Sequence, residues 1–240
     1  MDAPRDDLRP PSLARLLGEA RTAFEAPRLL AKGPALRRVP RGRGEPVLVL
    51  PGLGAGDAST WPLRRFLAGI GHRPHGWHLG VNTGNVEDLL PRVRARAEAI
   101  RNRAGRPVHL VGWSLGGVLA RELARDTPAL AAQVISFGTP VVGGPKYTRA
   151  AARYAADEVD RVAAIMADRR LVPISVPVTS IYSRNDGIVD WRACIDDDTP
   201  GARNIEVRST HLGMGIDPDV WQILAETLHA VPAQQPTADR

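Results

Sequence analysis

The 240-residue sequence contains little cysteine, little lysine and no long apolar run. Its single cysteine, Cys194, excludes an internal disulfide and any cysteine-based zinc or iron–sulfur framework. No apolar run approaches the roughly 20 residues that span a bilayer. Residues 1–7 are polar and acidic and lack the apolar segment of a secretory signal. We therefore expect a cytoplasmic protein that has no membrane-spanning helix.

Arginine supplies almost all of the basic charge, because Lys32 and Lys146 are the two lysines of a chain with a net charge of +6. The arginines are densest between residues 92 and 106. Aromatic residues make up only 5% of the chain, however, and no nucleic-acid-binding motif is present, so we expect no nucleic-acid partner. Hydrophobic residues (43%) and charged residues (24%) are typical of one folded domain of this length.

Short apolar runs alternate with helical patterns along most of the chain. Strands are predicted at residues 46–50, 74–80, 107–112, 133–138, 178–183 and 204–208, and helices at 59–69, 86–103 and 115–127. This alternation predicts an α/β fold with a mostly parallel central sheet flanked by helices. We expect an N-terminal helix and connector (1–45), one α/β domain (46–232) and a disordered tail (233–240).

Residues 12–30 are predicted to form an amphipathic helix, in which Arg15, Glu19 and Arg21 fall outside the apolar stripe. Two interpretations remain open. The helix packs on the outside of the domain, or its apolar side contacts a membrane or lipid, which makes peripheral membrane contact possible. The members of the stripe are Leu13, Leu16, Leu17, Ala20 and Phe24.

The most informative motif is GWSLGG at residues 112–117, between a predicted strand and a predicted helix. A Gly-x-Ser-x-Gly pattern in this context is typical of a nucleophile elbow. Glycines are needed at Gly112 and Gly116 because larger side chains would collide with neighbouring backbone in so sharp a turn. Ser114 is predicted to lie strained at the tip, near the positive end of the following helix.

A serine hydroxyl becomes a good nucleophile only when an oriented base removes its proton. Asp186 follows the predicted strand 178–183, and His211 follows the predicted strand 204–208. Catalytic groups of open α/β sheets gather outside the carboxyl ends of the strands, where all three side chains are expected. The sequence therefore predicts Ser114 as nucleophile, Asp186 as orienting acid and His211 as base.

Other acids and histidines compete with these assignments. Asp190 competes with Asp186, but it is expected to cap a short helix. His109 lies inside a predicted strand and is expected to be a buried, hydrogen-bonded histidine. The spacing of His72, His75 and His78 suggests a metal site, but neighbours three apart on a strand point to opposite faces, so we expect no metal.

The predicted strand 46–50 is followed by PGLGAGD at residues 51–57. Glycines after a strand let backbone N–H groups turn toward a ligand. The usual pair of donors to an oxyanion would be the N–H groups of Leu53 and of Leu115, the residue after the nucleophile.

Five segments together resemble the lipase and esterase type of the α/β-hydrolase superfamily, over residues 46–228: LPGLG (50–54), GWSLGG (112–117), FGTP (137–140), YSRNDGIV (182–189) and STHLG (209–213). Pro51 departs from the histidine that many members carry in the oxyanion loop, and Trp113 from the histidine that often precedes the nucleophile. The resemblance implies the α/β-hydrolase fold. It also implies a small helical cap over the site at residues 143–171, where the family commonly inserts one, although an ordinary pair of connecting helices would fit the same sequence.

The motifs and the resemblance together predict a cofactor-free serine hydrolase of carboxylic esters with an apolar acyl group, acting on a small-molecule or lipid ester. An acyltransferase or thioesterase would use the same three residues, and a ligand-binding module could retain the same fold. The residues expected to bind the acyl group are Trp113, Tyr147, Tyr154, Ile165 and Met166.

Overall fold

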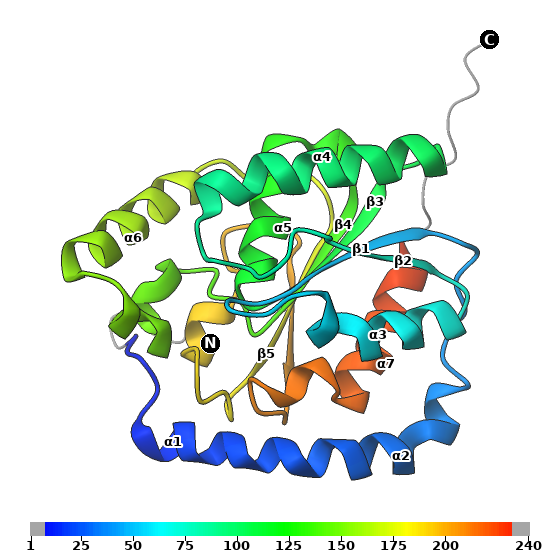
Figure 1. Ribbon diagram of the computed structural model, residues 1–240, viewed down its shortest axis with the longest axis horizontal. Coiled ribbons are helices and arrows are strands. Elements are labelled where there is room, and N and C mark those ends of the chain that lie inside the picture. The colour runs from blue at the N-terminus through cyan, green and yellow to red at the C-terminus, as the bar shows by residue number, and fades with distance from the viewer. Residues whose placement is uncertain (1–7, 232–240) are drawn as a thin grey trace.

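The computed structural model describes residues 8–231 and contains a six-stranded, wholly parallel sheet (Figure 1). The order across the sheet is β2-β1-β3-β4-β5-β6, with Val47 beside His109 and Val134 beside Val178 in the register. The predicted α/β fold with a parallel sheet flanked by helices is confirmed. The strands are β1 (Pro46–Leu50), β2 (Arg73–Gly76), β3 (Val108–Trp113), β4 (Ala131–Phe137), β5 (Val178–Ser183) and β6 (Arg203–Val207).

Both faces of the sheet are buried, because alternate residues of each central strand point to opposite sides. In β1, Val47 and Val49 join the core beneath helices α3 (Asp57–Gly69) and α7 (Pro218–Ala230). Leu48 and Leu50 join the core beneath α4 (Val86–Ala104) and α5 (Leu115–Asp126). The helical layers on the two sides are visible in Figure 1. The carboxyl ends of the strands are thereby left free to carry the functional loops.

The boundaries of several elements differ from the predicted ones. β2 is only four residues long and ends at Gly76, because the Asp57 carboxylate accepts hydrogen bonds from the N–H groups of Trp77 and His78 and turns the chain away. The predicted connector is helical as far as Leu36, whose side chain is buried in the core shared with α7. In both places tertiary contacts outweigh local propensity.

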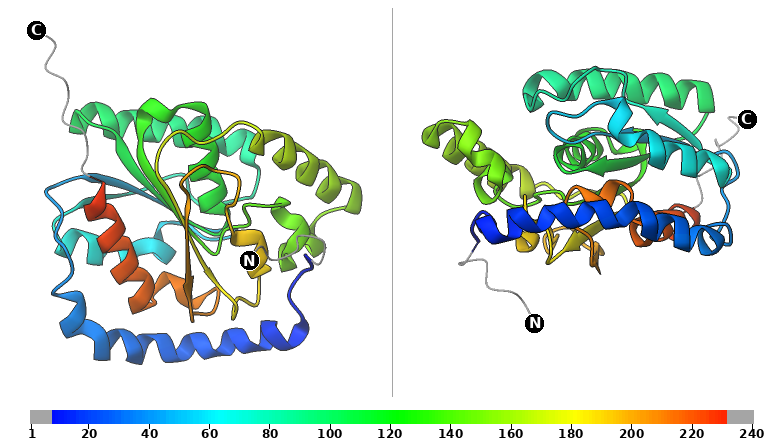
Figure 2. Two further views of the ribbon diagram at one scale, coloured as in Figure 1. Left: turned by 180° about the vertical axis from the view of Figure 1, so that it is seen from behind. Right: turned by 60° about the horizontal axis from the view of Figure 1, so that its bottom comes forward.

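The N-terminal helix extends further than predicted and presents a polar face to the domain. Helices α1 (Leu13–Gly18) and α2 (Glu25–Leu36), joined by a 3₁₀ stretch (Glu19–Phe24), form one rod along an edge of the molecule (Figures 1 and 2). We call residues 13–36 the N-terminal rod. Glu19 and Glu25 are buried, whereas Leu13, Leu17 and Phe24 are more than 60% exposed. The rod therefore packs on the outside of the domain, which is one of the two interpretations left open by the sequence, and it binds the domain through polar groups while these apolar side chains stay exposed.

Residues 143–171 are helical, as predicted, and contain two 3₁₀ turns (Gly144–Tyr147 and Arg149–Arg153) followed by α6 (Ala156–Arg170). Arg169 of α6 pairs with Glu122 and Asp126 of α5, which fixes this segment to the helix that follows the elbow. Its role as a cap stays a prediction. The predicted tail, 233–240, lies outside the described residues. Within residues 8–231, no helix is both long enough and apolar enough to cross a bilayer.

Candidate active site

The turn between β3 and α5 places Ser114 in a strained backbone conformation. Ser114 has φ 53° and ψ −122°, and it is one of two non-glycine residues with positive φ in the described part of the chain. Such a conformation costs on the order of 1–3 kcal/mol and persists only where the surrounding structure enforces it. The Ser114 side chain is half-buried at the carboxyl end of β3 and the start of α5. The strand–turn–helix context predicted for this residue is present.

Glycines enforce this turn by allowing the backbone to approach closely. A Cβ on Gly116 would lie 2.6 Å from the carbonyl carbon of Leu50 and 2.7 Å from the oxygen of Pro51. A Cβ on Gly112 would overlap the backbone of Gly117. Because these obstacles are backbone atoms and not flexible side chains, the space can hold only glycine. The steric reason given for Gly112 and Gly116 from the sequence is confirmed.

The loop after β1 passes directly beside the serine. A Cβ on Gly52 would lie 3.3 Å from Ser114 Cβ, so the backbone that leads to Leu53 borders the nucleophile turn. The fully buried Asn82 holds this loop: its Nδ2 donates to Pro51 O at 2.9 Å, and its carbonyl accepts from Gly54 N at 2.8 Å. Sequence reasoning missed Asn82, which lies beyond β2 and has no local signal.

Asp186 and His211 come together at the ends of β5 and β6. We call residues 184–189 the acid loop and residues 208–213 the histidine loop. His211 Nδ1 lies 2.7 Å from Asp186 Oδ2, and Asp186 is fully buried. The other carboxylate oxygen accepts hydrogen bonds from the N–H groups of Ile188 and Val189, at 2.8 and 2.7 Å. These bonds fix the carboxylate plane and hold one oxygen toward the imidazole.

The electrostatics of this pair favour a charged imidazole. His211 is buried, and burial by itself lowers the pKa of the ring. The charge and hydrogen bond of Asp186, together with the charge of Glu19, outweigh burial and raise the pKa of His211 above its ordinary 6.5. An imidazole held this way can accept a proton and stabilise the imidazolium that results.

The alternatives considered from the sequence lie elsewhere. Asp190 caps the 3₁₀ helix Trp191–Cys194 by accepting from Arg192 N at 3.0 Å, as expected of a helix cap. His109 is fully buried in β3, beside Gln133 Nε2 at 2.9 Å, and burial lowers its pKa to about 4. The predicted buried, hydrogen-bonded His109 is confirmed.

Gly138, at the end of β4, lies between the serine and the histidine. Ser114 N–H donates to Phe137 O at 2.9 Å, which ties the nucleophile turn to β4. A Cβ on Gly138 would lie 3.0 Å from His211 Nδ1, so the imidazole rests against this glycine. The structure thus brings the three predicted catalytic residues to the carboxyl ends of β3, β5 and β6, with β4 between the first two of these strands.

Trp113 and Tyr154 are the two predicted acyl-binding residues with contacts near the site. The Trp113 ring stacks on Phe137 with centroids 6.1 Å apart, and its centroid is 6.4 Å from that of His211. A Cβ on Gly84 would lie 2.9 Å from both the Tyr154 hydroxyl and Leu53 Cδ1. Tyr154 of the segment 143–171 and Leu53 of the loop after β1 therefore both lie close to Gly84.

The other three predicted acyl-binding residues are Tyr147, Ile165 and Met166, and each has a different environment. Tyr147 packs against a small cluster of buried residues that includes Val142 and Val189. Met166 lies against Gly144, and Ile165 is 42% exposed on α6. Their roles in acyl binding stay predictions.

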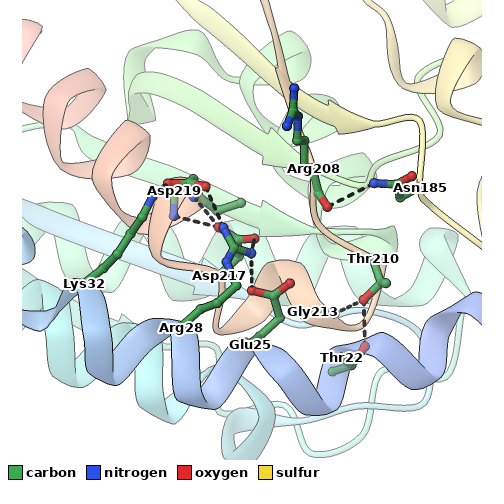
Figure 3. Close-up of polar contacts among 11 residues, drawn as sticks. Thr22, Glu25, Arg28, Lys32, Asn185, Arg208, Thr210, Gly213, Asp217 and Asp219 are labelled. Atoms are coloured by element: carbon green, nitrogen blue, oxygen red, sulfur yellow. Dashed lines mark hydrogen bonds and ion pairs between the residues drawn. The ribbon is translucent and has the colours of Figure 1, made fainter.

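Glu19 is a site residue that sequence reasoning missed, having placed it outside the apolar stripe. It is 7% exposed, and its carboxylate faces both the acid loop and the histidine loop. Figure 3 shows further polar contacts of the rod, with Thr22 against Thr210 and Arg28 against Asp217. No local pattern distinguishes such a glutamate from a solvent-exposed one.

The three histidines with metal-like spacing, His72, His75 and His78, lie in different environments. His72 is buried with Nδ1 3.2 Å from Glu45 Oε2, and burial is the main cause that lowers its pKa. His75 lies on β2, and His78 has positive φ. Among residues 8–231, no group of three or more His, Cys, Asp or Glu side chains is placed to hold a metal ion.

Comparisons with known proteins identify the fold. No protein-family model matches the chain. A pimeloyl-[acyl-carrier protein] methyl ester esterase from Methylococcus capsulatus is 34% identical over 113 residues, 41% of this chain. The chain thus spans about two-fifths (39%) of that relative's length.

Solved structures align over most of the chain. A structure from work on the metagenome-derived lipolytic enzymes LipS and LipT has a TM-score of 0.61 and 17% identity, covering 80% of this chain and 95% of its own. A monoacylglycerol lipase from Paleococcus ferrophilus has a TM-score of 0.56 and 18% identity, covering 78% and 95%. With its parallel sheet and strand–turn–helix serine, the chain has the α/β-hydrolase fold.

Proposed function

We propose that this protein is a serine hydrolase that cleaves carboxylic esters with an apolar acyl group through an acyl-enzyme on Ser114. The observation that carries the proposal is a strained serine at the tip of a strand–turn–helix, with the buried Asp186–His211 pair at the same end of the sheet. Both the curated relative and the lipolytic structures act on esters by their names, which supports an ester substrate.

The proposed reaction has two halves. Ser114 Oγ attacks the acyl carbonyl carbon while His211 Nε2 takes the hydroxyl proton, and the imidazolium then protonates the departing alcohol. Water, deprotonated by the same nitrogen, then attacks the acyl carbon, and the imidazolium returns its proton to Ser114 Oγ as the acid departs. Asp186 holds the imidazole in the tautomer whose Nε2 is free to accept a proton, because its carboxylate faces Nδ1.

The developing oxyanion would be stabilised by the N–H groups of Leu53 and Leu115. Leu115 is the first residue of α5, where the helix leaves N–H groups without an intrahelical partner. Leu53 follows Gly52, which lies against the serine. One such donor is worth roughly 10²–10³ in kcat. The apolar side chains of the two leucines and Trp113 favour an apolar acyl group.

A fluorophosphonate probe tests the nucleophile directly. We expect single labelling of the wild type and none of Ser114→Ala, because only an activated serine reacts. A ladder of p-nitrophenyl esters, followed by release of free acid, then gives the acyl preference. Undiminished labelling of Ser114→Ala would overturn the assignment, and acyl transfer to an added alcohol in preference to water would favour the acyltransferase alternative.

We propose in addition that the outward face of the N-terminal rod contacts an anionic lipid surface. Its exposed apolar side chains, Leu13, Leu17, Phe24 and Leu30, are 62%, 70%, 66% and 81% exposed. Both acidic residues of the rod are buried, so its exposed charge is entirely basic. An apolar row with basic neighbours is typical of helices that lie in the headgroup region of a bilayer.

Vesicle sedimentation tests this contact. We expect binding to phosphatidylglycerol vesicles that Leu13→Ser/Leu17→Ser/Phe24→Ser abolishes and that Leu171→Ser, a change at a residue 82% exposed outside the rod, preserves. Equal binding by both variants, or a concentration-dependent dimer in place of vesicle binding, would overturn it.

A further inference from the structure

The N-terminal rod touches both catalytic loops through one buried carboxylate. Glu19 Oε1 accepts hydrogen bonds from Gly187 N at 2.7 Å and from His211 N at 3.0 Å. Glu19 Oε2 accepts from Leu212 N at 2.9 Å. One side chain therefore binds the backbone next to Asp186 and the backbone of His211 itself.

Burial gives these three bonds their strength. Glu19 is 7% exposed, and hydrogen bonds from backbone N–H groups to an ionised carboxylate are shorter and stronger than those between neutral groups. A buried carboxylate without such donors would be costly, so Glu19 and its partners hold one another in place. The rod and the acid loop also approach each other closely. A Cβ on Gly187 would overlap the carbonyl oxygen of Arg15 in the preceding turn of the rod.

We infer that Glu19 is a positioning residue of the catalytic pair, an inference that rests on the proposed function. The carboxylate sets the separation between the acid loop and the histidine loop, and hence the alignment of Asp186 with His211 Nδ1. A misplacement of about 1 Å in such an arrangement can cost on the order of 100-fold in rate. The negative charge of Glu19 also favours the protonated imidazole.

The other polar contacts of the rod show why Glu19 is the one with this role. Thr22 Oγ1 lies 2.7 Å from Thr210 Oγ1 and reaches only the histidine loop. Glu25 pairs with Arg28 at 2.5 Å, and Arg28 in turn pairs with Asp217, the cap of α7. Only Glu19 among these contacts binds both loops.

The test compares Glu19→Gln with Glu25→Gln, a matched change of a buried carboxylate on the same rod. In Glu19→Gln the amide replaces one acceptor by a donor and removes the charge. We expect roughly 10- to 100-fold lower kcat. We also expect the acid limb of the kcat/KM profile to move to lower pH, because the pKa of His211 falls without Glu19. In Glu25→Gln we expect lower thermal stability, with the acid limb in its wild-type place.

The rate of fluorophosphonate labelling separates failure of this inference from failure of the proposed function. An unlabelled wild type would refute the function. A labelled wild type whose Glu19→Gln variant reacts at the same rate, with an unmoved pH profile, would overturn the positioning role alone. If Glu19→Gln does not fold, Glu19→Asp gives the same information. It keeps the charge but shortens the reach, so labelling should slow while the acid limb stays near its wild-type place, and wild-type labelling would overturn the inference.

Discussion

The proposed nucleophile, Ser114, and its two proposed partners, Asp186 and His211, are held in place by different physical means. Ser114 is held by steric contact. Gly112 and Gly116 allow neighbouring backbone segments to pack so closely that the turn has no room for another conformation. Asp186 and His211 are fixed by attraction, through hydrogen bonds to carboxylates. We call the turn at residues 112–116 the nucleophile side and the Asp186–His211 pair the acid–base side. Substitutions that add volume should therefore damage the nucleophile side, and substitutions that alter charge or hydrogen bonding should damage the acid–base side.

The largest expected effect comes from breaking the acid–base side at its centre. Asp186→Asn turns a donor toward His211 Nδ1 and favours the wrong tautomer. We expect kcat to fall by about 10⁴-fold, as in chymotrypsin-type triads, with the fold retained. Asp190→Asn should stay within several-fold of wild type. Steady-state kinetics on one short ester checks both, and the reverse order of losses would assign the acid to Asp190.

Added volume on the nucleophile side should damage the fold as well as the activity. Gly116→Ala places a methyl group against the carbonyls of Leu50 and Pro51, and we expect a loss of roughly 3 kcal/mol or more in unfolding free energy. Gly69→Ala is the control, because nothing lies within 4 Å of its Cβ position. Urea unfolding measures both. A stable, active Gly116→Ala variant would contradict the account of the turn.

The two sides should also differ in their dependence on pH. Burial lowers the pKa of His109, in the nucleophile strand, to about 4. The neutral His109 ring therefore contributes to stability at a pH above 6.5, its pKa in the unfolded chain, and this contribution is lost as the pH falls toward 4. A pKa shift of this size corresponds to a change of roughly 3 kcal/mol in the free energy of unfolding. His211, whose pKa is raised, contributes in the opposite sense: its stabilisation is present below 6.5 and is lost at higher pH.

Urea unfolding of the wild type and of His109→Gln at about pH 7 and about pH 4.5 separates these contributions. We expect the wild type to lose more stability on acidification than the variant does. Activity should follow His211 instead, rising with pH through a value above 6.5 in both proteins. An equal acid loss in the variant would show that His109 is not its source.

The smallest expected effect concerns the segment 143–171. Tyr154→Ala removes the side chain that lies near Leu53, and we expect a graded shift of the preferred acyl length, worth about 1–3 kcal/mol. Leu171→Ala, a change at a residue that is 82% exposed, should leave the preference unchanged. The p-nitrophenyl ester ladder measures both. Identical ladders for wild type and Tyr154→Ala would make this segment a connector and not a cap.

The same contrast explains what could be predicted from the sequence. The nucleophile turn is encoded locally, because the strand, the two glycines and the helix around Ser114 adjoin one another in the chain. The parallel sheet could be predicted for a similar reason, since strands buried on both faces consist of short apolar runs. Asp186 and His211 could be proposed from chain order, but their contact depends on two loops whose spacing the sequence does not specify.

The N-terminal rod shows why the remainder could not be predicted. Its apolar stripe is real, but periodicity identifies a stripe without saying which face meets the domain. The inward face is chosen by the donors that Glu19 meets on the acid and histidine loops, which are far away in sequence. Asn82 could not be predicted for the same reason. Its role depends on the hydrogen bond from its side chain to Pro51 O, a residue 31 positions earlier in the chain.

The contacts of Glu19 have a consequence for how the protein reaches its active form. The residues that it binds lie 168, 192 and 193 positions further along the chain. Contacts of such large sequence separation form late, because closing the intervening loop costs entropy before any bond compensates for it. During synthesis the rod emerges before these partners, which follow it by 168 or more positions. The sheet and the nucleophile turn can form before that point, so hydrolytic competence should be the last property that the folding chain acquires.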